Sequence, residues 1–269
     1  MTKSIFITGA TDGIGLETAK RLASLGHEVI LHGRNPAKLE SVQDQVAATS
    51  DKDSIEAHVA DLSRMSEVAA LATSIADRHR SLDVLINNAG VFQTHTPTTP
   101  NGLDLRFVVN TLAPYLLTQR LLPLMSTKGR VLNLSSAAQS TVDLKAMRGQ
   151  VPLKDREAYA QSKLALTMWT RSVAHSQQGI GPSVIAVNPG SLLGSKMVKE
   201  AFGIDGGDLG IGADILVRAA LSEEFGQASG SYFDNDAGEF AAPHPDALDP
   251  QKMADVVRTI ESILADLLG

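Results

Sequence analysis

The chain has 269 residues, of which 43% are hydrophobic and 20% charged, and its 30 acidic residues outnumber its 24 basic ones. This composition is typical of a globular protein and excludes collagen-like, low-complexity and intrinsically disordered chains. The absence of cysteine excludes disulfides and thiolate zinc sites, and the net charge of −6 disfavours a nucleic acid or an anionic membrane as partner.

No apolar run approaches the length of about 18 residues that a membrane span needs. The apolar stretch before Gly9 is also too short for a secretory signal, which needs about 7–15 residues. We therefore expect a cytoplasmic protein without a membrane span.

Strand-like and helix-like stretches alternate along the chain. The β-rich runs lie at 4–8, 28–32, 55–60, 82–87, 130–135, 183–187 and 231–233. Helical periodicity extends over 14–25, 36–48, 64–79, 103–125, 157–175, 212–224 and 251–268. This alternation predicts an α/β fold, a doubly wound parallel sheet of the Rossmann type with helices on both faces, formed by a single domain over 1–269.

Two irregular stretches, 137–156 and 191–211, are longer than ordinary loops. Long loops in compact domains often close over a ligand, although a plain surface excursion is the alternative. The second stretch contains five glycines and the apolar residues Met197, Phe202 and Ile204. It is therefore predicted to be a substrate lid.

The first β-rich run leads into a glycine-rich turn, Thr8-Gly9-Ala10-Thr11-Asp12-Gly13-Ile14-Gly15. Such glycines allow a tight turn and a close backbone approach to a pyrophosphate, and the following helix N-terminus attracts phosphate. The alternative is a tight turn without a ligand. The predicted cofactor residues here are Gly9, Thr11, Asp12, Gly13, Ile14 and Gly15.

The second β-rich run ends in His32-Gly33-Arg34. In an NAD site, a carboxylate about 20 residues beyond the glycines binds the ribose 2′-hydroxyl, but that position here is Gly33. Arg34 follows, and its guanidinium suits a 2′-phosphate. The sequence therefore predicts NADP(H) as cofactor; the alternative is that Arg34 is an exposed side chain after a strand.

The third and fourth runs also end in polar residues. Ligands bind at the carboxyl ends of strands in open α/β sheets, although Asp, Asn and Gly are common turn residues as well. The predicted cofactor residues at these ends are Asp61, Leu62, Asn88, Ala89 and Gly90.

Tyr159 and Lys163 are four positions apart and therefore share one helix face. An ammonium group lowers the pKa of a nearby phenol towards a range that suits acid–base chemistry. Ser136 follows the fifth β-rich run, and Asn110 lies among apolar residues, where an amide needs a hydrogen-bond partner. A single Tyr–Lys pair is modest evidence, and Asn110 is equally compatible with an ordinary contact between helices.

Other chemistries lack their motifs. The sequence contains no Gly-x-Ser-x-Gly elbow, no Walker loop and no His-Glu-x-x-His pattern. We therefore predict no metal site.

Taken in order, Thr-Gly-x-x-x-Gly-x-Gly, Asn-Asn-Ala-Gly, Tyr-x-x-x-Lys and Asn-Pro-Gly closely resemble the short-chain dehydrogenase/reductase family over nearly the whole chain. The resemblance implies a sheet of about seven parallel strands. It implies a catalytic tetrad of Asn110, Ser136, Tyr159 and Lys163. It also implies cofactor contacts for Asp61 at the adenine, for Asn88 at the ribose, and for Pro189, Gly190 and Leu192 at the nicotinamide.

The chain departs from the family pattern in two places. Ser136 and Tyr159 are 23 positions apart, which is longer than usual, and this insertion resembles the branch of retinol dehydrogenases and protochlorophyllide reductases. The hydroxyl residue expected to hold the carboxamide is replaced by Gly194, and Ser195 follows. The sequence leaves open whether Ser195 substitutes for it, and whether Ser135 rather than Ser136 faces the substrate.

The resemblance implies hydride transfer between NADP(H) and a small carbonyl or alcohol substrate, with Tyr159 as proton donor or acceptor. Ser136 would bind the same oxygen, Lys163 would lower the pKa of Tyr159, and Asn110 would hold a water. The alternatives are a non-catalytic NADP-binding regulator, or an isomerase or dehydratase. The pocket residues suggest an apolar substrate. Its identity, the direction of the reaction and whether the chain is a homo-oligomer cannot be read from the sequence.

Overall fold

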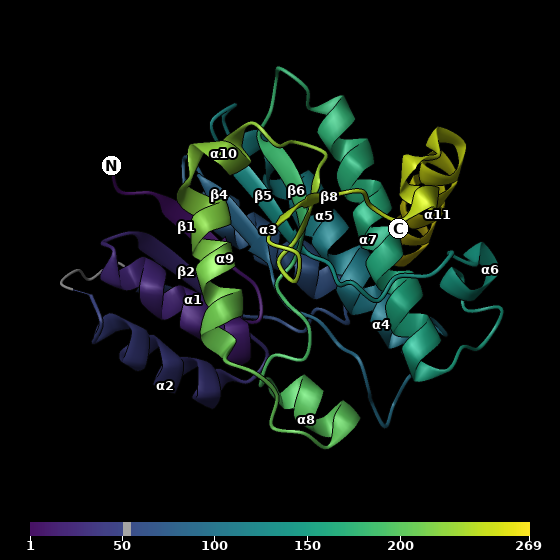
Figure 1. Cartoon of the computed structure of the whole chain (residues 1–269), viewed down its shortest axis with the longest axis horizontal. Coiled ribbons are helices and arrows are strands. Elements are labelled where there is room, and N and C mark those ends of the chain that lie inside the picture. The colour runs from purple at the N-terminus through teal and green to yellow at the C-terminus, as the bar shows by residue number, and fades with distance from the viewer. Residues whose placement is uncertain (51–54) are drawn as a thin grey trace.

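The computed structural model describes residues 1–50 and 55–269, except for the side chain of Phe202. Within these residues, the strands form one sheet in the order β3-β2-β1-β4-β5-β6-β7-β8 (Figure 1). The strands are β1 Ser4–Ile7, β2 Glu28–Gly33, β3 Ile55–Val59, β4 Val84–Asn87, β5 Arg130–Leu134, β6 Ser183–Asn188, β7 Tyr232–Asp234 and β8 Glu239–Ala241.

All neighbouring strands from β3 to β7 pair in parallel, so the predicted doubly wound parallel sheet is confirmed. An eighth strand, β8, was not expected and pairs with β7 in antiparallel fashion, with Phe233 opposite Phe240. Its three residues are largely exposed and form no apolar run, so the pattern of buried strands did not reveal it. The hairpin turn between them ends at Gly238, which has a positive φ of 74°.

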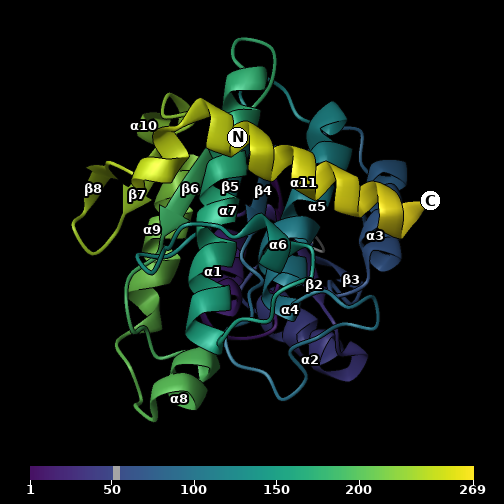
Figure 2. The same cartoon turned by 90° about the vertical axis from the view of Figure 1, so that its right-hand side faces the viewer.

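Helices cover both faces of the sheet (Figures 1 and 2). On one face, α1, α2 and α9 share an apolar core with the strands. On the other face, α3, α5, α7 and α11 form a second core with them. The helices are α1 Gly13–Ser24, α2 Pro36–Ala47, α3 Met65–Arg78, α4 Leu105–Phe107, α5 Ala113–Leu121, α6 Leu144–Met147, α7 Asp155–Ser176, α8 Lys196–Phe202, α9 Leu209–Leu221, α10 Glu223–Gly226 and α11 Pro250–Leu268, with 3₁₀ turns at Leu122–Leu124 and Pro245–Leu248.

The stretch 103–125, predicted as one helix, is divided. A π-helical turn, Val108–Leu112, separates α4 from α5. Pro114 explains the interruption, because it has no N–H for the carbonyl of Asn110 four residues earlier and its ring clashes with that carbonyl. The π turn therefore occurs at the position of the predicted tetrad residue Asn110.

The two long stretches are only partly irregular, since 137–156 contains α6 and 191–211 contains α8. Glycines at the base of the second stretch allow backbones to pack closely. Gly194 N donates to the Gly207 carbonyl at 2.7 Å, and a Cβ on Gly206 would lie 2.7 Å from Gly194 Cα. These glycines thus hold the segments around positions 194 and 207 together.

None of the described helices is both long and apolar enough to span a bilayer. In the same part of the chain, no group of three or more His, Asp or Glu side chains is arranged to hold a metal ion.

Candidate active site

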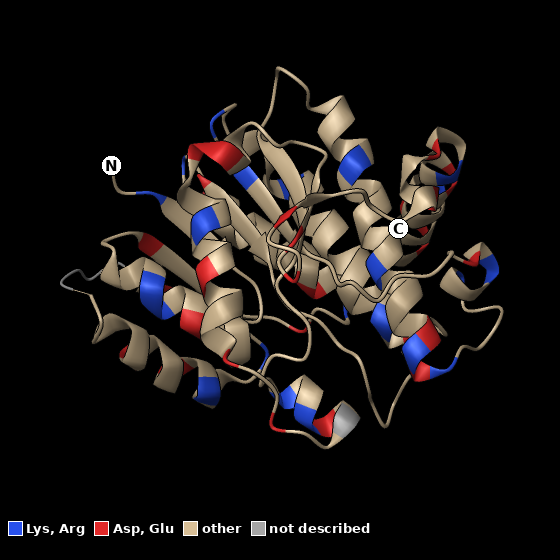
Figure 3. Ribbon diagram, viewed as in Figure 1, with Lys and Arg blue, Asp and Glu red and all other residues tan. Residues whose placement is uncertain are grey.

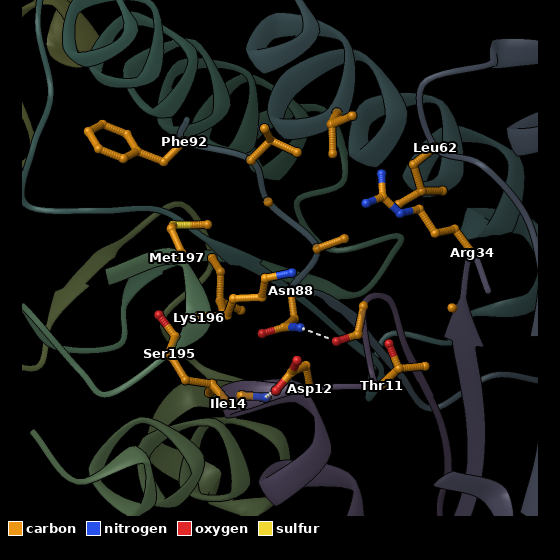
Figure 4. Close-up of a pocket in the computed structure, with 18 of the residues that line it drawn as sticks. Thr11, Asp12, Ile14, Arg34, Leu62, Asn88, Phe92, Ser195, Lys196 and Met197 are labelled. Carbon is orange, nitrogen blue, oxygen red and sulfur yellow. Dashed lines mark hydrogen bonds between the residues drawn. The ribbon is translucent and has the colours of Figure 1, made fainter. Parts of the chain in front are cut away.

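A cavity of about 670 Å³ opens at the carboxyl ends of the strands, near the point where the strand order reverses between β1 and β4 (Figure 4). Ligands bind at such switch points in open α/β sheets, and pockets for small molecules are commonly about 300–1,000 Å³. Among the predicted residues, those that line it are Gly9, Thr11, Asp12, Gly13, Ile14, Arg34, Asp61, Leu62, Asn88, Ala89, Gly90, Tyr159, Lys163 and Pro189. Gly15, Asn110, Ser136, Gly190 and Leu192 do not line it.

The glycine-rich turn packs tightly against the end of β4. A Cβ on Gly9 would lie 2.9 Å from Ala89 Cα, and one on Gly15 would lie 2.4 Å from the Gly9 carbonyl. Asn88 Nδ2 donates to the carbonyls of Thr8 and Gly9 at 2.9 and 3.0 Å. The side-chain amide of Asn88 therefore fixes the position of the glycine turn. The glycines leave the backbone of the turn accessible from the cavity.

Asp12 is the N-cap of α1, where its Oδ1 accepts from Gly13 N at 2.8 Å. Lys38 Nζ donates to Asp12 Oδ2 at 2.7 Å, and this hydrogen bond is the main reason that the pKa of Asp12 is lowered. Lys38 also lines the cavity, and our sequence analysis missed it. The available signal was its position in the first turn of the helix that follows Arg34.

Arg34 is exposed at the rim of the cavity, beside Leu62 (Figure 4). The absence of a side chain at Gly33 has a packing reason as well, because a Cβ there would lie 2.4 Å from Thr11 Cγ2. Asp61 Oδ1 accepts from Ser63 N at 2.9 Å and so caps the turn after β3.

His32 is a second residue that sequence analysis missed, although a histidine inside an apolar strand was a visible signal. Its Nδ1 accepts from Gly9 N at 3.2 Å, and its Nε2 bonds to the Ala60 carbonyl at 3.0 Å. The side chain is buried, and burial lowers the pKa of His32 from 6.5 to about 4. A neutral imidazole thus ties the glycine turn to the end of β3.

Tyr159 and Lys163 come from α7 and lie beside Ser136, which follows β5. The Ser136 side chain lies close enough to the Tyr159 phenol to lower its pKa, and Phe92 packs edge-on against the Tyr159 ring at 4.8 Å. Lys163 Nζ lies 5.6 Å from the centre of that ring and donates to the Leu134 carbonyl at 2.6 Å. The structure therefore brings Ser136, Tyr159 and Lys163 together.

Burial has opposite effects on the two titratable groups. It raises the pKa of the Tyr159 phenol, against the lowering effect of the Ser136 hydrogen bond, and it lowers the pKa of Lys163 to about 8. The sequence predicts that the Lys163 ammonium lowers the pKa of the phenol; the causes of the shift in the structure are burial and the Ser136 hydrogen bond. The Tyr159 phenol is protonated at neutral pH and therefore has a proton to donate.

The choice between the two serines depends on where their hydroxyls point. Ser135 lines the cavity, but its Oγ lies 2.7 Å from Thr167 Oγ1 of α7 and the residue is buried. Ser136 is the serine whose hydroxyl meets Tyr159.

Asn110 is fully engaged by protein groups. Its Oδ1 accepts from Val91 N at 2.8 Å, and its Nδ2 donates to the Val91 carbonyl at 2.9 Å and to Ser162 Oγ at 3.0 Å. A Cβ on Gly90 would lie 3.5 Å from Asn110 Oδ1 and 3.6 Å from Lys163 Nζ. The side chain of Asn110 therefore joins the segment after β4 to α7 close to Lys163.

The segment after β6 is held by the β7–β8 turn, which sequence analysis did not single out. Asp236 accepts from Ser191 N at 2.8 Å and from Asn188 Nδ2 at 2.9 Å. Asn235 Nδ2 donates to the Pro189 carbonyl at 2.9 Å. Only the fold reveals these partners, because they are more than 40 residues away in sequence.

Beyond Pro189, Leu192 is exposed. Its φ is 53°, and it is the one described residue other than glycine that has a positive φ. Ser195 Oγ accepts from Val198 N at 3.3 Å and so caps α8. Of the apolar residues predicted to cover a substrate, Met197 lines the cavity and Ile204 is exposed. The side chain of Phe202 lies outside the described residues.

Comparison with known proteins agrees with this geometry. The family model for the short chain dehydrogenases matches residues 3–203. Retinol dehydrogenase 13 of Mus musculus is 32% identical, with 99% of this chain and 84% of that protein covered. Retinol dehydrogenase 12 of the same species is 34% identical, with 86% and 77% covered.

Solved structures show the same relationship. A Mycobacterium paratuberculosis protein superimposes with a TM-score of 0.81 at 25% identity, covering 98% of this chain and 93% of that one. An NADPH-bound carbonyl reductase from chicken fatty liver gives a TM-score of 0.70 at 25% identity, covering 90% and 99%. The sequence match, the shared fold and the residues assembled around the cavity agree, and the chain belongs to the short-chain dehydrogenase family.

Proposed function

We propose that this oxidoreductase interconverts a carbonyl group and an alcohol on a small apolar substrate, with NADP(H) as cofactor. The observation that carries the proposal is that Ser136 and Lys163 lie beside Tyr159, and that Tyr159 and Lys163 line a cavity that also holds the cations Arg34 and Lys38. The named relatives support the apolar substrate, since retinol is an apolar alcohol.

The residues present fit such a cofactor. The glycine turn leaves room for a close backbone approach, and the N-terminus of α1 faces the cavity with N–H groups that bind phosphate. Arg34 and Lys38 provide positive charge where a ribose 2′-phosphate would lie. When bound, NADP(H) supplies or accepts the hydride.

The chain's own residues then handle the proton. Tyr159, which is protonated at neutral pH, donates its proton to the oxygen of a carbonyl that is being reduced. Ser136 donates a hydrogen bond to the same oxygen and stabilises the charge that develops there. Lys163 holds its ammonium beside the phenol, and Asn110 fixes the surrounding backbone. Phe92, Leu105, Val109 and Met197 line the cavity and would exclude water from the substrate.

The proposal is tested by following NADPH oxidation with a panel of apolar and polar aldehydes and ketones. Tyr159→Phe should lower kcat by at least about 100-fold, the lower end for loss of a general acid, while NADPH still binds. Tyr115→Phe is the matched control, because its hydroxyl bonds to Glu261 at 2.8 Å, away from the cavity. Wild-type turnover in Tyr159→Phe would refute the role given to Tyr159.

A further inference from the structure

Helix α8 carries a lysine into the predicted diphosphate end of the cavity. Lys196, its first residue, lines the cavity together with Asp12, Gly13 and Ile14 of the glycine turn. The preceding residue is close to that turn, because a Cβ on Gly13 would lie 3.7 Å from Ser195 Cβ. Figure 4 shows Ser195, Lys196 and Met197 along one side of the cavity, with Arg34 and Leu62 on the other.

The charges around Lys196 are mixed. Its ammonium lies 3.5 Å from Glu200 one turn later, in an exposed pair, and it also contributes to lowering the pKa of Asp12. Asp12 places a carboxylate at the N-terminus of α1, where it would repel a phosphate. Lys38 and Lys196 are the cations that offset this carboxylate.

We propose that Lys196 binds the diphosphate of the dinucleotide, from the segment opposite the N-terminus of α1. This inference rests on the proposed function, because it assumes that a dinucleotide occupies the cavity. A diphosphate carries more negative charge than Glu200, so the flexible lysine side chain exchanges its long, exposed ion pair for the ligand. The segment 191–211 is thereby tied to the bound cofactor through one charge.

The same helix offers a matched control. Lys199 is as exposed as Lys196, with 71% and 73% of the side chain accessible. It pairs with Asp205 at 3.1 Å and does not line the cavity. Figure 3 shows basic positions in blue on α8. Lys196→Met and Lys199→Met therefore remove the same charge from the same helix, one inside the cavity and one outside it.

The experiment measures binding by calorimetry with three probes: NADPH, 2′-phospho-ADP-ribose, which keeps the diphosphate without the nicotinamide, and adenosine 2′-monophosphate, which lacks the diphosphate. Lys196→Met should raise the Kd of the first two about tenfold, the low end for a charge-assisted hydrogen bond because the site is exposed. It should leave the Kd of adenosine 2′-monophosphate unchanged within about twofold. Lys199→Met should leave the Kd values of all three probes unchanged.

Equal Kd values for NADPH in the two variants would overturn the inference. An equal loss of affinity for adenosine 2′-monophosphate in Lys196→Met would overturn it too, because that probe has no diphosphate to contact. If the wild-type protein binds NADPH and the variants do not differ, the proposed function stands and only the role of Lys196 falls. If the wild-type protein binds neither NADPH nor 2′-phospho-ADP-ribose, the proposed cofactor itself is wrong.

Discussion

At the scale of single residues, Arg34 and Lys38 have different surroundings and should therefore act differently on the cofactor. Arg34 is exposed, whereas Lys38 is bonded to Asp12 at the glycine turn. An aspartate at position 33 would be the obvious change to make the site prefer NADH, but its Cβ would lie 2.4 Å from Thr11 Cγ2, which is too close. Gly33→Asp would therefore disturb the glycine turn together with the charge, and removing the cations is the cleaner test.

We expect Arg34→Ala to lower kcat/KM for NADPH by about tenfold or more, through loss of a charge-assisted hydrogen bond, and to leave the value for NADH unchanged. Lys38→Ala should lower kcat/KM for both cofactors, because it also leaves the Asp12 carboxylate unpaired beside the diphosphate. The measurement is steady-state kinetics with each cofactor. An NADPH:NADH ratio that Arg34→Ala does not alter would show that Arg34 does not select the cofactor.

His32 makes the fold sensitive to acid. Its pKa is about 4 in the folded protein and 6.5 as the ordinary value, so the unfolded chain binds a proton first as the pH falls. The stability that the neutral imidazole contributes is complete above pH 6.5 and is lost progressively towards pH 4. Between pH 7 and pH 5 the loss is about 2 kcal/mol.

Urea unfolding at several pH values between 5 and 7 checks this expectation. The free energy of unfolding of the wild type should fall more steeply with acidification than that of His32→Gln, which cannot titrate. Parallel curves for the two proteins would contradict the assignment.

At the scale of elements, the segment 191–211 combines fixed and exposed parts. Gly194 and Gly207 fix its base, and Asp236 holds Ser191, while the basic residues of α8 are exposed. Elements with few buried contacts open locally at low cost in free energy, and cofactor contacts at Met197 and Lys196 would oppose that opening. We therefore propose that α8 is the moving part of a lid and that its glycine base does not move.

Trypsin should cut the protein without cofactor after Lys196 or Lys199, and more slowly when NADP and a substrate are present. Mass spectrometry of the fragments locates the cuts. The same cutting rate with and without ligands would argue against a lid.

At the scale of the whole molecule, α11 covers the helices that carry the site. It packs across α7 and reaches α3, and its buried face includes Met253, Val256 and Ile260 (Figure 2). Tyr115 OH donates to Glu261 Oε1 at 2.8 Å and so links α5 to α11. Trp169 of α7 is fully buried beneath this layer.

We expect Ile260→Ala to lower the free energy of unfolding by about 2–5 kcal/mol, the range for truncating a buried aliphatic side chain. Asp266→Ala, on the exposed face of the same helix, should change it by less than about 0.5 kcal/mol. Chemical denaturation measures both. At a temperature where both variants are folded, their kcat should match the wild type, because α11 does not line the cavity.

The sequence by itself determined the features that depend on local pattern. Runs of apolar residues buried on both sides specified the parallel strands, and glycines at fixed spacing specified the turn at Gly9, because only glycine allows such close backbone approach. The spacing of Tyr159 and Lys163 on one helix face likewise needed no tertiary information. These signals lie within a few residues of one another, so the chain alone carries them.

Only the tertiary structure decided the contacts between distant segments. It turned the hydroxyl of Ser135 into the core and that of Ser136 towards Tyr159. It brought Lys38 into contact with Asp12, His32 with the glycine turn and Asp236 with Ser191, and it buried Tyr159, which raises the pKa of its phenol. Each of these depends on which elements pack together and how deeply they are buried, and local sequence pattern specifies neither.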